Sequence, residues 1–343
     1  MIRVLIADDS SLVRAILKDI LAGGDIAVAG EAANGQEAVE LTELLRPDLV
    51  VMDIVMPVMD GLTAIGEIMA RAPTPILVLS ASVTDREVDL AFAAIKAGAL
   101  DVMEKPAENL VGTGVSFAEK LRETVRILSR VKVIHHHPRR RREPLVPSPA
   151  PAECRRSVLA IGASTGGPKA VMSIVKALPP GFPAAVCIVQ HIASGFARGF
   201  TQWLDNESSL KVRLAREGDI LMPGEALVAP DDRHMTIAGG AVRLLDTPPV
   251  NCCRPSIDPL FCSLAEGKGE EVVGVLLTGM GRDGAQGLRQ IRERGGMTIV
   301  QDEASSVIFG MPRAAIALGA AGQVAPLDAI PAIITELFSV QGG

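Results

Sequence analysis

The feature that most constrains the fold is a regular alternation of short apolar runs with longer amphipathic stretches, repeated five times before residue 130. The apolar runs have the length of β-strands, and the amphipathic stretches have the apolar spacing of α-helices. Strict alternation of this kind predicts a parallel sheet covered by helices on both faces, here a flavodoxin-like α/β domain over residues 1–129. The expected strands are Ile2–Ala7, Ile26–Glu31, Leu49–Met52, Ile76–Ser80 and Leu100–Met103, and the expected helices are Leu12–Leu21, Gly35–Leu45, Leu62–Arg71, Glu87–Ala97 and Phe117–Leu128.

The alternation resumes after a break and predicts a second, doubly wound α/β domain over residues 157–343. In its middle lie two short apolar runs, His234–Ile237 and Val242–Leu245, separated by Gly239-Gly240. A glycine pair between two such runs predicts a β-hairpin inserted into this domain. A third short run, Ala226–Ala229, precedes them. The other expected strands are Val158–Ile161, Ala185–Val189, Val272–Leu277 and Thr298–Val300.

The break itself, residues 130–156, combines a His run, an Arg run and several prolines. Its eight Lys and Arg residues against two Glu give a net charge of +6. Charged and proline-rich segments extend rather than pack, so we interpret it as an interdomain linker. Contact with nucleic acid or an anionic membrane through the Arg run is the alternative, and a solvated linker is favoured over it.

Composition excludes several classes of protein. The chain has a net charge of −6, with 34 Lys and Arg against 40 Asp and Glu, and only eight Phe, one Trp and no Tyr, which argues against nucleic-acid binding. No apolar run approaches the ~18 residues needed to insert into a membrane, and the N-terminus does not resemble a secretory signal. Five cysteines without a CxxC motif argue against a disulfide framework or a zinc ribbon, so we expect a cytoplasmic protein.

Acidic side chains follow two strands of the first expected sheet. Asp8 and Asp9 come after the first strand, and Asp53 comes after the third. The carboxyl ends of strands line the ligand crevice of such a sheet, and clustered carboxylates need a hard cation such as Mg²⁺. Ser80 and Lys105 follow two later strands and could contact an anion held near Asp53.

The motifs Ala7–Ser10 (ADDS) and Met52–Gly61 (MDIVMPVMDG), together with Ser80 and Lys105-Pro106, resemble the receiver domain of two-component response regulators. The resemblance covers Ile2 to about Leu128. It implies a histidine kinase as phosphodonor, Mg²⁺ for phosphorylation and a cis bond before Pro106. It further implies Asp53 as the phosphoacceptor, Asp8 and Asp9 as magnesium ligands, Ser80 as the switch hydroxyl and Lys105 as the phosphoryl contact.

One position departs from the receiver pattern. The family often places an aromatic switch residue three positions before the lysine, and Val102 stands there in this chain. This departure argues against coupling through an aromatic rotamer.

In the second domain, the first strand leads into Gly162–Pro168 (GASTGGP) and then into a helical pattern. Gly162, Ser164 and Gly166 fit the G-x-S-x-G nucleophile elbow between a strand and a helix, and the helix N-terminus could stabilise an oxyanion. Flanking glycines would permit the strained turn that exposes Ser164. The alternative is a phosphate cradle of a dinucleotide fold. The spacing is not G-x-G-x-x-G, and the next strand ends in Gln190-His191 rather than an acidic residue, so the nucleophile is favoured.

A serine nucleophile needs a base and an orienting carboxylate. His191 is the favoured base, because it directly follows the next strand and lies on the sheet edge expected for Ser164. His234 lies beside the hairpin, where a structural role is favoured. Asp283, in the loop after the strand Val272–Leu277, could orient the imidazole, and Asp302 is the rival carboxylate or a helix cap. We predict Ser164, His191 and Asp283 as the triad.

The segments around these residues, together with Gln301–Ala315 (QDEASSVIFGMPRAA), resemble the chemotaxis protein-glutamate methylesterases, the CheB family. The resemblance covers about Val158 to Leu337. It implies hydrolysis of glutamate γ-methyl esters on methyl-accepting chemotaxis receptors, deamidation of certain receptor glutamines, and Thr165 and Met280 as active-site and oxyanion neighbours.

The same resemblance implies a receiver that covers the active site until Asp53 is phosphorylated, an esterase that needs no cofactor, and peripheral association with receptor arrays. The alternative hypothesis is a receiver linked to a non-catalytic module that binds a partner or nucleotide. A DNA-binding output is disfavoured, because the second half shows no helix-turn-helix pattern and no basic recognition helix.

Overall fold

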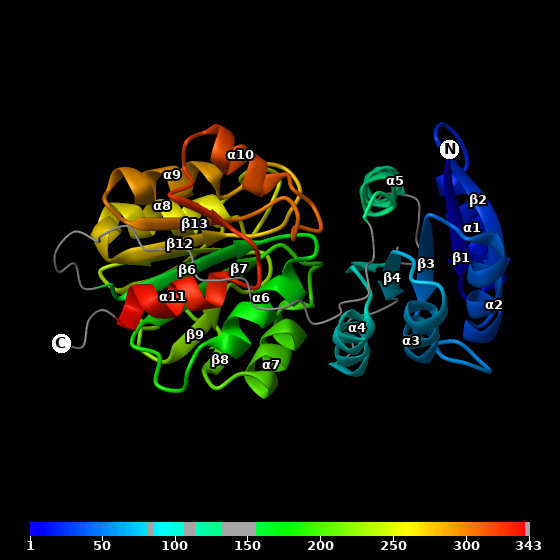
Figure 1. Ribbon diagram of the computed structural model, residues 1–343, viewed down its shortest axis with the longest axis horizontal. Helices are drawn as coiled ribbons and strands as arrows, with labels where there is room; N and C mark the ends of the chain where they lie inside the picture. The colour runs from blue at the N-terminus through cyan, green and yellow to red at the C-terminus, as the bar shows by residue number, and fades with distance from the viewer. Residues whose placement is uncertain (81–84, 106–113, 132–155, 340–343) are drawn as a thin grey trace.

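The computed structural model describes residues 1–80, 85–105, 114–131 and 156–339. These residues form two α/β units, each with helices on both faces of a parallel sheet (Figure 1). Most of the expected linker and the peptide bond before Pro106 lie outside the described residues. Within them, no helix combines the length and the apolar character needed to cross a membrane.

The N-terminal unit is a five-stranded sheet with the order β2-β1-β3-β4-β5. Every neighbouring pair of its strands is parallel, which confirms the flavodoxin-like prediction. The strands are β1 (Ile2–Ala7), β2 (Ile26–Ala32), β3 (Leu49–Asp53), β4 (Ile76–Ser80) and β5 (Asp101–Glu104), and the helices are α1 (Ser11–Leu21), α2 (Gly35–Leu45), α3 (Gly61–Arg71), α4 (Asp85–Ala97) and α5 (Gly114–Leu128).

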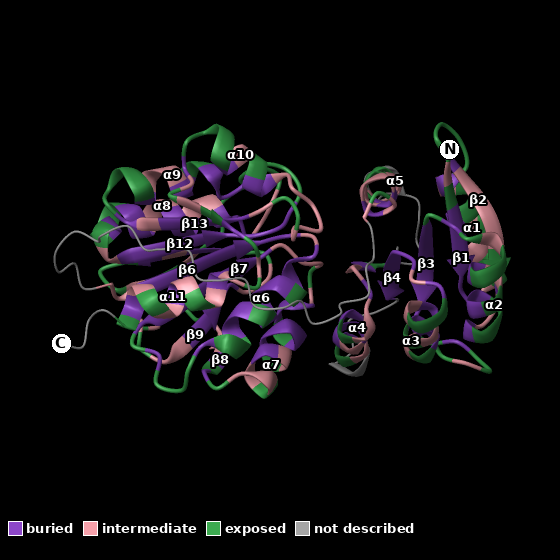
Figure 2. Ribbon diagram, viewed as in Figure 1, coloured by how far each residue is buried: buried purple, intermediate pink, exposed green. Residues whose placement is uncertain are grey.

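Burial and capping explain why these elements form. The central strands β3 and β4 are buried along their whole length, because helices cover both faces, as the purple strands of Figure 2 show. The Asp60 side chain accepts a hydrogen bond from the Thr63 N–H and caps α3. A Cβ at Gly61 would lie 2.0 Å from the Asp53 carbonyl oxygen, so only glycine lets α3 begin beside the end of β3.

The C-terminal unit has a seven-stranded sheet in the order β14-β13-β12-β6-β7-β9-β8, with all neighbours parallel. The strand order reverses at β6, which pairs with β12 on one side and β7 on the other, and ligands bind at such a switch point. The strands are β6 (Val158–Ala163), β7 (Ala185–Gln190), β8 (Lys211–Leu214), β9 (Glu225–Val228), β12 (Val272–Leu276), β13 (Met297–Gln301) and β14 (Gln323–Ala325). The α-helices are α6 (Gly167–Ala177), α7 (Ala197–Glu207), α8 (Ile257–Lys268), α9 (Ala285–Glu293), α10 (Met311–Ala317) and α11 (Ile330–Ser339), and a short 3₁₀-helix, η1, spans Gly269–Glu271.

The inserted hairpin is confirmed. Strands β10 (His234–Ala238) and β11 (Ala241–Leu245) pair antiparallel. Gly239 and Gly240 join them with φ values of 60° and 77°, the left-handed pair that a two-residue turn requires. The preceding short run forms β9 in the main sheet.

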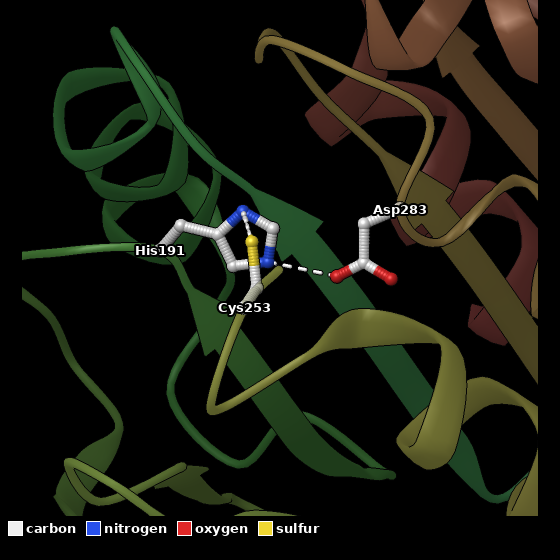
Figure 3. Close-up of side chains that lie close together, drawn as sticks. All are labelled: His191, Cys253 and Asp283. Atoms are coloured by element: carbon white, nitrogen blue, oxygen red, sulfur yellow. Dashed lines mark hydrogen bonds and ion pairs between the residues drawn. The ribbon is translucent and has the colours of Figure 1, made fainter. Parts of the chain in front are cut away.

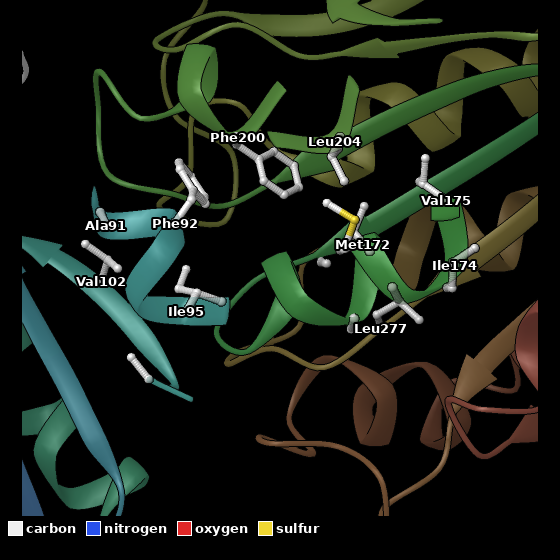
Figure 4. Close-up of a cluster of buried hydrophobic side chains, with 14 of the residues drawn as sticks. Ala91, Phe92, Ile95, Val102, Met172, Ile174, Val175, Phe200, Leu204 and Leu277 are labelled. Carbon is white, nitrogen blue, oxygen red and sulfur yellow. The ribbon is translucent and has the colours of Figure 1, made fainter. Parts of the chain in front are cut away.

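The two units share a continuous apolar contact between α4 of the first and α6 and α7 of the second (Figure 4). The Phe92 ring stacks on Trp203 with centroids 5.6 Å apart and lies 5.8 Å from the Phe200 ring. At the edge of this contact Lys96 Nζ lies 2.7 Å from Glu207 Oε1. Helix α4 therefore forms the apolar part of this contact on the side of the first unit.

Candidate functional site

The sheet edge of the first unit brings three charged side chains together. Lys105 Nζ lies 2.7 Å from Asp8 Oδ2 and 2.8 Å from Asp53 Oδ2. Asp8 is 1% exposed and Asp53 is 7% exposed. Burial raises the pKa of Asp53, aided by the nearby charge of Asp8, while the Lys105 ammonium opposes the rise.

The same edge holds a group of carboxylates that could bind a metal ion. One carboxylate oxygen from each of Asp8, Asp9 and Asp53 lies within 4.8 Å of the others. Three carboxylates at this spacing fit a hard divalent cation, and Asp9 is exposed to solvent, which leaves room for water ligands.

Two further predicted receiver residues lie on neighbouring strands. Ser80 is buried at the end of β4, and its carbonyl oxygen accepts a 2.7 Å hydrogen bond from the Lys105 N–H. Val102 is a buried aliphatic residue of β5, where the aromatic residue of the family pattern is missing. The structure thus places Ser80 beside Lys105.

In the second unit, strand register places the predicted nucleophile beside the predicted base. Ala163 of β6 pairs with Gln190 of β7, so Ser164 and His191 leave adjacent strands at the same level. The His191 N–H donates to the Ala163 carbonyl oxygen at 2.9 Å. Gln190 Nε2 donates to the carbonyl oxygens of Ser164 and His191, at 2.7 and 2.8 Å, and ties the two loops together.

The turn after Ser164 differs from the strained elbow that the motif predicts. The left-handed residue is Gly166, with a φ of 73°, and Ser164 is not among the residues with positive φ. The strand–turn–helix context is present, but glycine carries the unusual backbone because α6 begins immediately after it. A Cβ at Gly167 would lie 2.2 Å from Gln190 Oε1, so the helix start needs glycine as well.

The predicted base and carboxylate are in direct contact. His191 Nε2 lies 2.8 Å from Asp283 Oδ2 (Figure 3). Asp283 also accepts hydrogen bonds of 2.7 Å from the Ser256 hydroxyl and the Ile257 N–H. Burial alone would raise the pKa of Asp283, but His191 and these donors outweigh it and lower that pKa to about 2. The carboxylate is therefore ionised and able to orient the imidazole.

The second nitrogen of the same imidazole faces a cysteine. Cys253 Sγ lies 3.6 Å from His191 Nδ1. Burial lowers the pKa of His191, but the hydrogen bonds to Asp283 and Cys253 outweigh it and raise that pKa to about 9, so rising pH favours the neutral form. An ionised carboxylate only accepts, so in the neutral ring Nε2 carries the proton and Nδ1 is the acceptor that faces the Cys253 thiol. Within the described ranges, the Ser164 hydroxyl makes no hydrogen bond to His191.

The two rival residues have structural roles. His234 is fully buried, and its Nδ1 accepts from the Ser256 N–H while Nε2 lies 3.1 Å from the Pro248 carbonyl oxygen. Asp302 accepts from the backbone N–H and the hydroxyl of Ser305 in the turn after β13. His234 thus supports the loop that carries Ser256 rather than the reacting centre.

The two expected active-site neighbours lie in loops beside Ser164. The Thr165 carbonyl oxygen accepts from the Thr278 hydroxyl at 3.0 Å. Met280 is 37% exposed, next to Gly279, where a Cβ would lie 2.6 Å from Ser164 Cβ. The loop after β12 therefore approaches the serine through a glycine, and this leaves Met280 at the surface.

Sequence reasoning missed the loop that surrounds Asp283. Besides Cys253, that loop contributes Asn251, whose Nδ2 donates to Asp283 Oδ1 at 2.8 Å, and Ser256. None of these residues follows a strand of the sheet, so the rule used for the other candidates cannot find them. The adjacent pair Cys252-Cys253 was the only visible signal.

An acidic pocket at the edge of the first sheet, and a histidine–aspartate pair one strand away from Ser164 in the second, fit a response regulator with a hydrolase domain. Family models agree: residues 159–334 match CheB methylesterase, and residues 4–111 match the response regulator receiver domain. The chain belongs to the CheB methylesterase family.

Named relatives resemble the whole chain. A protein-glutamate methylesterase/protein-glutamine glutaminase 2 of Anaeromyxobacter dehalogenans is 49% identical, with 98% of this chain and 97% of the relative covered. A similarly named protein of Geobacter metallireducens is 46% identical, covering 98% and 99%. The crystal structure of the Thermotoga maritima CheB methylesterase catalytic domain aligns with a TM-score of 0.51 at 36% identity, covering 53% of this chain and 98% of that one.

Proposed function

We propose that the protein hydrolyses glutamate γ-methyl esters on methyl-accepting chemotaxis receptors, releasing methanol and restoring glutamate, under the control of Asp53 phosphorylation. Deamidation of receptor glutamines is the same acyl transfer with ammonia as the leaving group. The observation that carries the proposal is the 2.8 Å contact between His191 Nε2 and Asp283 Oδ2 at the switch point of the second sheet, where Ser164 and His191 leave adjacent strands.

In the first step, Ser164 Oγ attacks the ester carbonyl carbon while the neutral form of His191 accepts the hydroxyl proton. Asp283 already engages Nε2, so Nδ1 is the nitrogen that takes this proton. The reacting nitrogen is the opposite one to that used in the chymotrypsin-type triad. Collapse of the tetrahedral intermediate breaks the bond to the methoxy group, which leaves as methanol with the proton from His191.

In the second step, water attacks the acyl-serine carbonyl and gives a proton to His191, the bond between the acyl carbon and Ser164 Oγ breaks, and Oγ takes the proton back from His191 as the glutamate product leaves. The start of α6 presents backbone N–H groups next to Ser164, where the developing oxyanion needs donors. Thr165 and Met280 flank this position. No cofactor takes part in either step of the proposal.

The receiver supplies the control. A histidine kinase is the proposed phosphodonor: a carboxylate oxygen of Asp53 attacks the phosphorus and the donor's bond to phosphorus breaks. Mg²⁺, when bound, neutralises charge on the transferring group, and Asp8, Asp9 and Asp53 would hold it. Lys105 would move from its carboxylate partners to the phosphoryl oxygens, and Ser80 would donate to the same group.

Contacts between the two units support the proposal that the receiver restricts the active site. Val307 and Ile308, in the loop that adjoins the Ser164 turn, pack against the apolar core of the receiver. A Cβ at Gly166 would lie 2.6 Å from Val307 Cβ, so this loop also touches the nucleophile turn. The Asp101 carboxylate of β5 accepts a hydrogen bond from the Thr165 side chain. Separation of the units would free the residues on both sides of Ser164.

Substitution of Gly199 by alanine is expected to activate the enzyme without phosphorylation. A Cβ at Gly199 of α7 would lie 1.9 Å from Val88 Cγ1 of α4, so the side chain must push the units apart. Overpacking costs ~1–3 kcal/mol, and we expect about a three- to tenfold higher rate of methanol release without phosphodonor. Gly267→Ala, in α8, is the matched control, since a Cβ there meets nothing within 4 Å. Equal rates for the two variants would contradict the proposed control by α4.

Asp101 predicts a pH dependence of this closed arrangement. Desolvation raises the pKa of Asp101 from 3.8 to about 6, against the opposing hydrogen bonds from the Val102 N–H and Thr165. The Asp101 carboxyl group therefore binds its proton more tightly in the packed arrangement of the two units than in a solvated one. The packed arrangement loses stability as pH rises from about 4 to about 6. Asp101→Asn removes the charge and is expected to lower the unstimulated methylesterase rate severalfold at about pH 7.5.

The two unstimulated rates should converge as the pH falls towards about 5, where the wild-type carboxyl group is also protonated. A ratio of wild-type to Asp101→Asn rates that does not change with pH would contradict the assignment.

The wider setting is proposed on the same basis. The enzyme acts in the cytoplasm and associates peripherally with receptor arrays, and residues 130–156 are the linker between residues 1–129 and 157–343.

Mass spectrometry of receptor peptides tests the substrate directly: ester-bearing glutamates should lose one methylene unit and susceptible glutamines should become glutamates. Unchanged peptides after incubation with folded protein would favour the non-catalytic alternative.

A further inference from the structure

The active-site cysteine and histidine have the separation of two ligands on one metal ion. Cys253 Sγ and His191 Nδ1 are 3.6 Å apart (Figure 3). A tetrahedral zinc ion has Zn–S bonds of about 2.3 Å and Zn–N bonds of about 2.0–2.1 Å, which place the two ligand atoms about 3.5 Å apart. The pair could therefore take a zinc ion with little movement of either side chain.

The far side of the imidazole is also arranged as in metal sites. Histidine ligands usually donate their other ring N–H to a carboxylate, which fixes the ring and makes the ligand nitrogen more basic. His191 Nε2 lies 2.8 Å from Asp283 Oδ2, and Asp283 is itself held by the Ser256 hydroxyl. One ligand atom from each of His191, Cys253 and Asp283 lies within 4.8 Å of the others.

The cysteine is held in place by its own loop. The backbone groups of Val250 and Cys253 pair with each other at 2.9 and 3.1 Å. Between them, Asn251 and Cys252 both adopt left-handed backbone, with φ values of 50° and 62°. Asn251 Nδ2 also donates to Asp283 Oδ1, so the thiol and the carboxylate keep a fixed relation to one ring.

We propose that His191 Nδ1 and Cys253 Sγ form a binding site for a thiophilic divalent cation, Zn²⁺, at the active site. The thiol loses its proton on binding, and water completes the coordination. The zinc ion occupies the lone pair that Nδ1 uses to accept the serine proton, so it inhibits the esterase reversibly. This inhibitory consequence rests on the proposed function, whereas the binding site itself does not.

Cobalt titration of the full chain tests the site without an activity measurement. The metal-free protein is titrated with Co²⁺ in excess Mg²⁺, and thiolate-to-cobalt charge-transfer absorption is recorded. The receiver carboxylates and the His135–His137 run contain no sulfur, so they do not contribute to this absorption. Wild type and the exposed-cysteine control Cys252→Ser should both show it, and Cys253→Ser should not.

Competition with a chromophoric chelator then gives the zinc affinity, and Cys253→Ser should bind at least about tenfold more weakly than Cys252→Ser. Equal cobalt spectra or equal zinc affinities in the two variants would overturn the proposal. Absence of the charge-transfer absorption in wild type would also overturn it, and the contact would then be only a thiol–imidazole hydrogen bond. If methanol release is measurable, zinc should inhibit wild type and Cys252→Ser, with recovery on chelation. A protein that binds zinc through Cys253 but never releases methanol would defeat the proposed function and leave the metal site standing.

Discussion

Ser164→Ala is expected to lower the rate of methanol release by about 10⁴-fold or more, because no other group can form the acyl intermediate. The variant should fold normally, since the hydroxyl makes no hydrogen bond among the described residues and alanine fills nearly the same space. Methanol release from methylated receptor membranes measures the loss, and incorporation of phosphate from a small phosphodonor shows whether the receiver still works.

Ser173→Ala provides the matched control, because Ser173 is an exposed serine of α6, the helix that follows the nucleophile turn. It should retain the wild-type rate. Substantial release by Ser164→Ala would defeat the assignment of the nucleophile, whatever the state of the receiver.

The second large effect is expected for Asp283→Asn, with a loss of about 10³–10⁴-fold in kcat. The asparagine amide can donate to His191 Nε2, which forces the proton onto Nδ1 and removes the acceptor that the serine needs. Some stability will also be lost, because Ser256 and Ile257 donate to this carboxylate in the native protein. Thermal unfolding of the variant separates this loss from the catalytic one.

Asp302→Asn is the control for the carboxylate, because Asp302 was the rival in the sequence and instead caps the turn at Ser305. It should cost little activity. The triad assignment would be wrong if Asp302→Asn were the more damaging change, or if folded Asp283→Asn kept its activity.

Elements buried on both faces were predictable from the sequence. Their strands read as continuous apolar runs, so β3, β4 and β6 were located to within two residues. The same rule located the candidate site, because Asp53 ends a strand and Ser164, His191 and Asp283 lie in segments that follow strands. Strands β8 and β14 were missed, since they lie at the sheet edges, are short and are only partly buried.

What escaped prediction depends on contacts between distant segments. Cys253, which contacts His191, comes from the loop before α8 and is 62 residues away along the chain. No local sequence pattern predicts that contact. The stacking of Phe92 on Trp203 joins two units whose separate patterns are each complete without it. Gly166, and not Ser164, has the left-handed backbone, because the conformation of this turn depends on where α6 begins and on the packing of Val307. The G-x-S-x-G motif contains no information on either.

The central claim is that phosphorylation of Asp53 controls an esterase whose nucleophile is Ser164. The most direct test is the rate of methanol release from methylated receptor membranes by wild type, Asp53→Asn and Ser164→Ala, each with and without a small phosphodonor and Mg²⁺. Wild type should release methanol faster with the donor, Asp53→Asn should stay at the unstimulated rate, and Ser164→Ala should release none. Equal stimulation of Asp53→Asn, or no release by folded wild type from a competent receptor, would contradict the account.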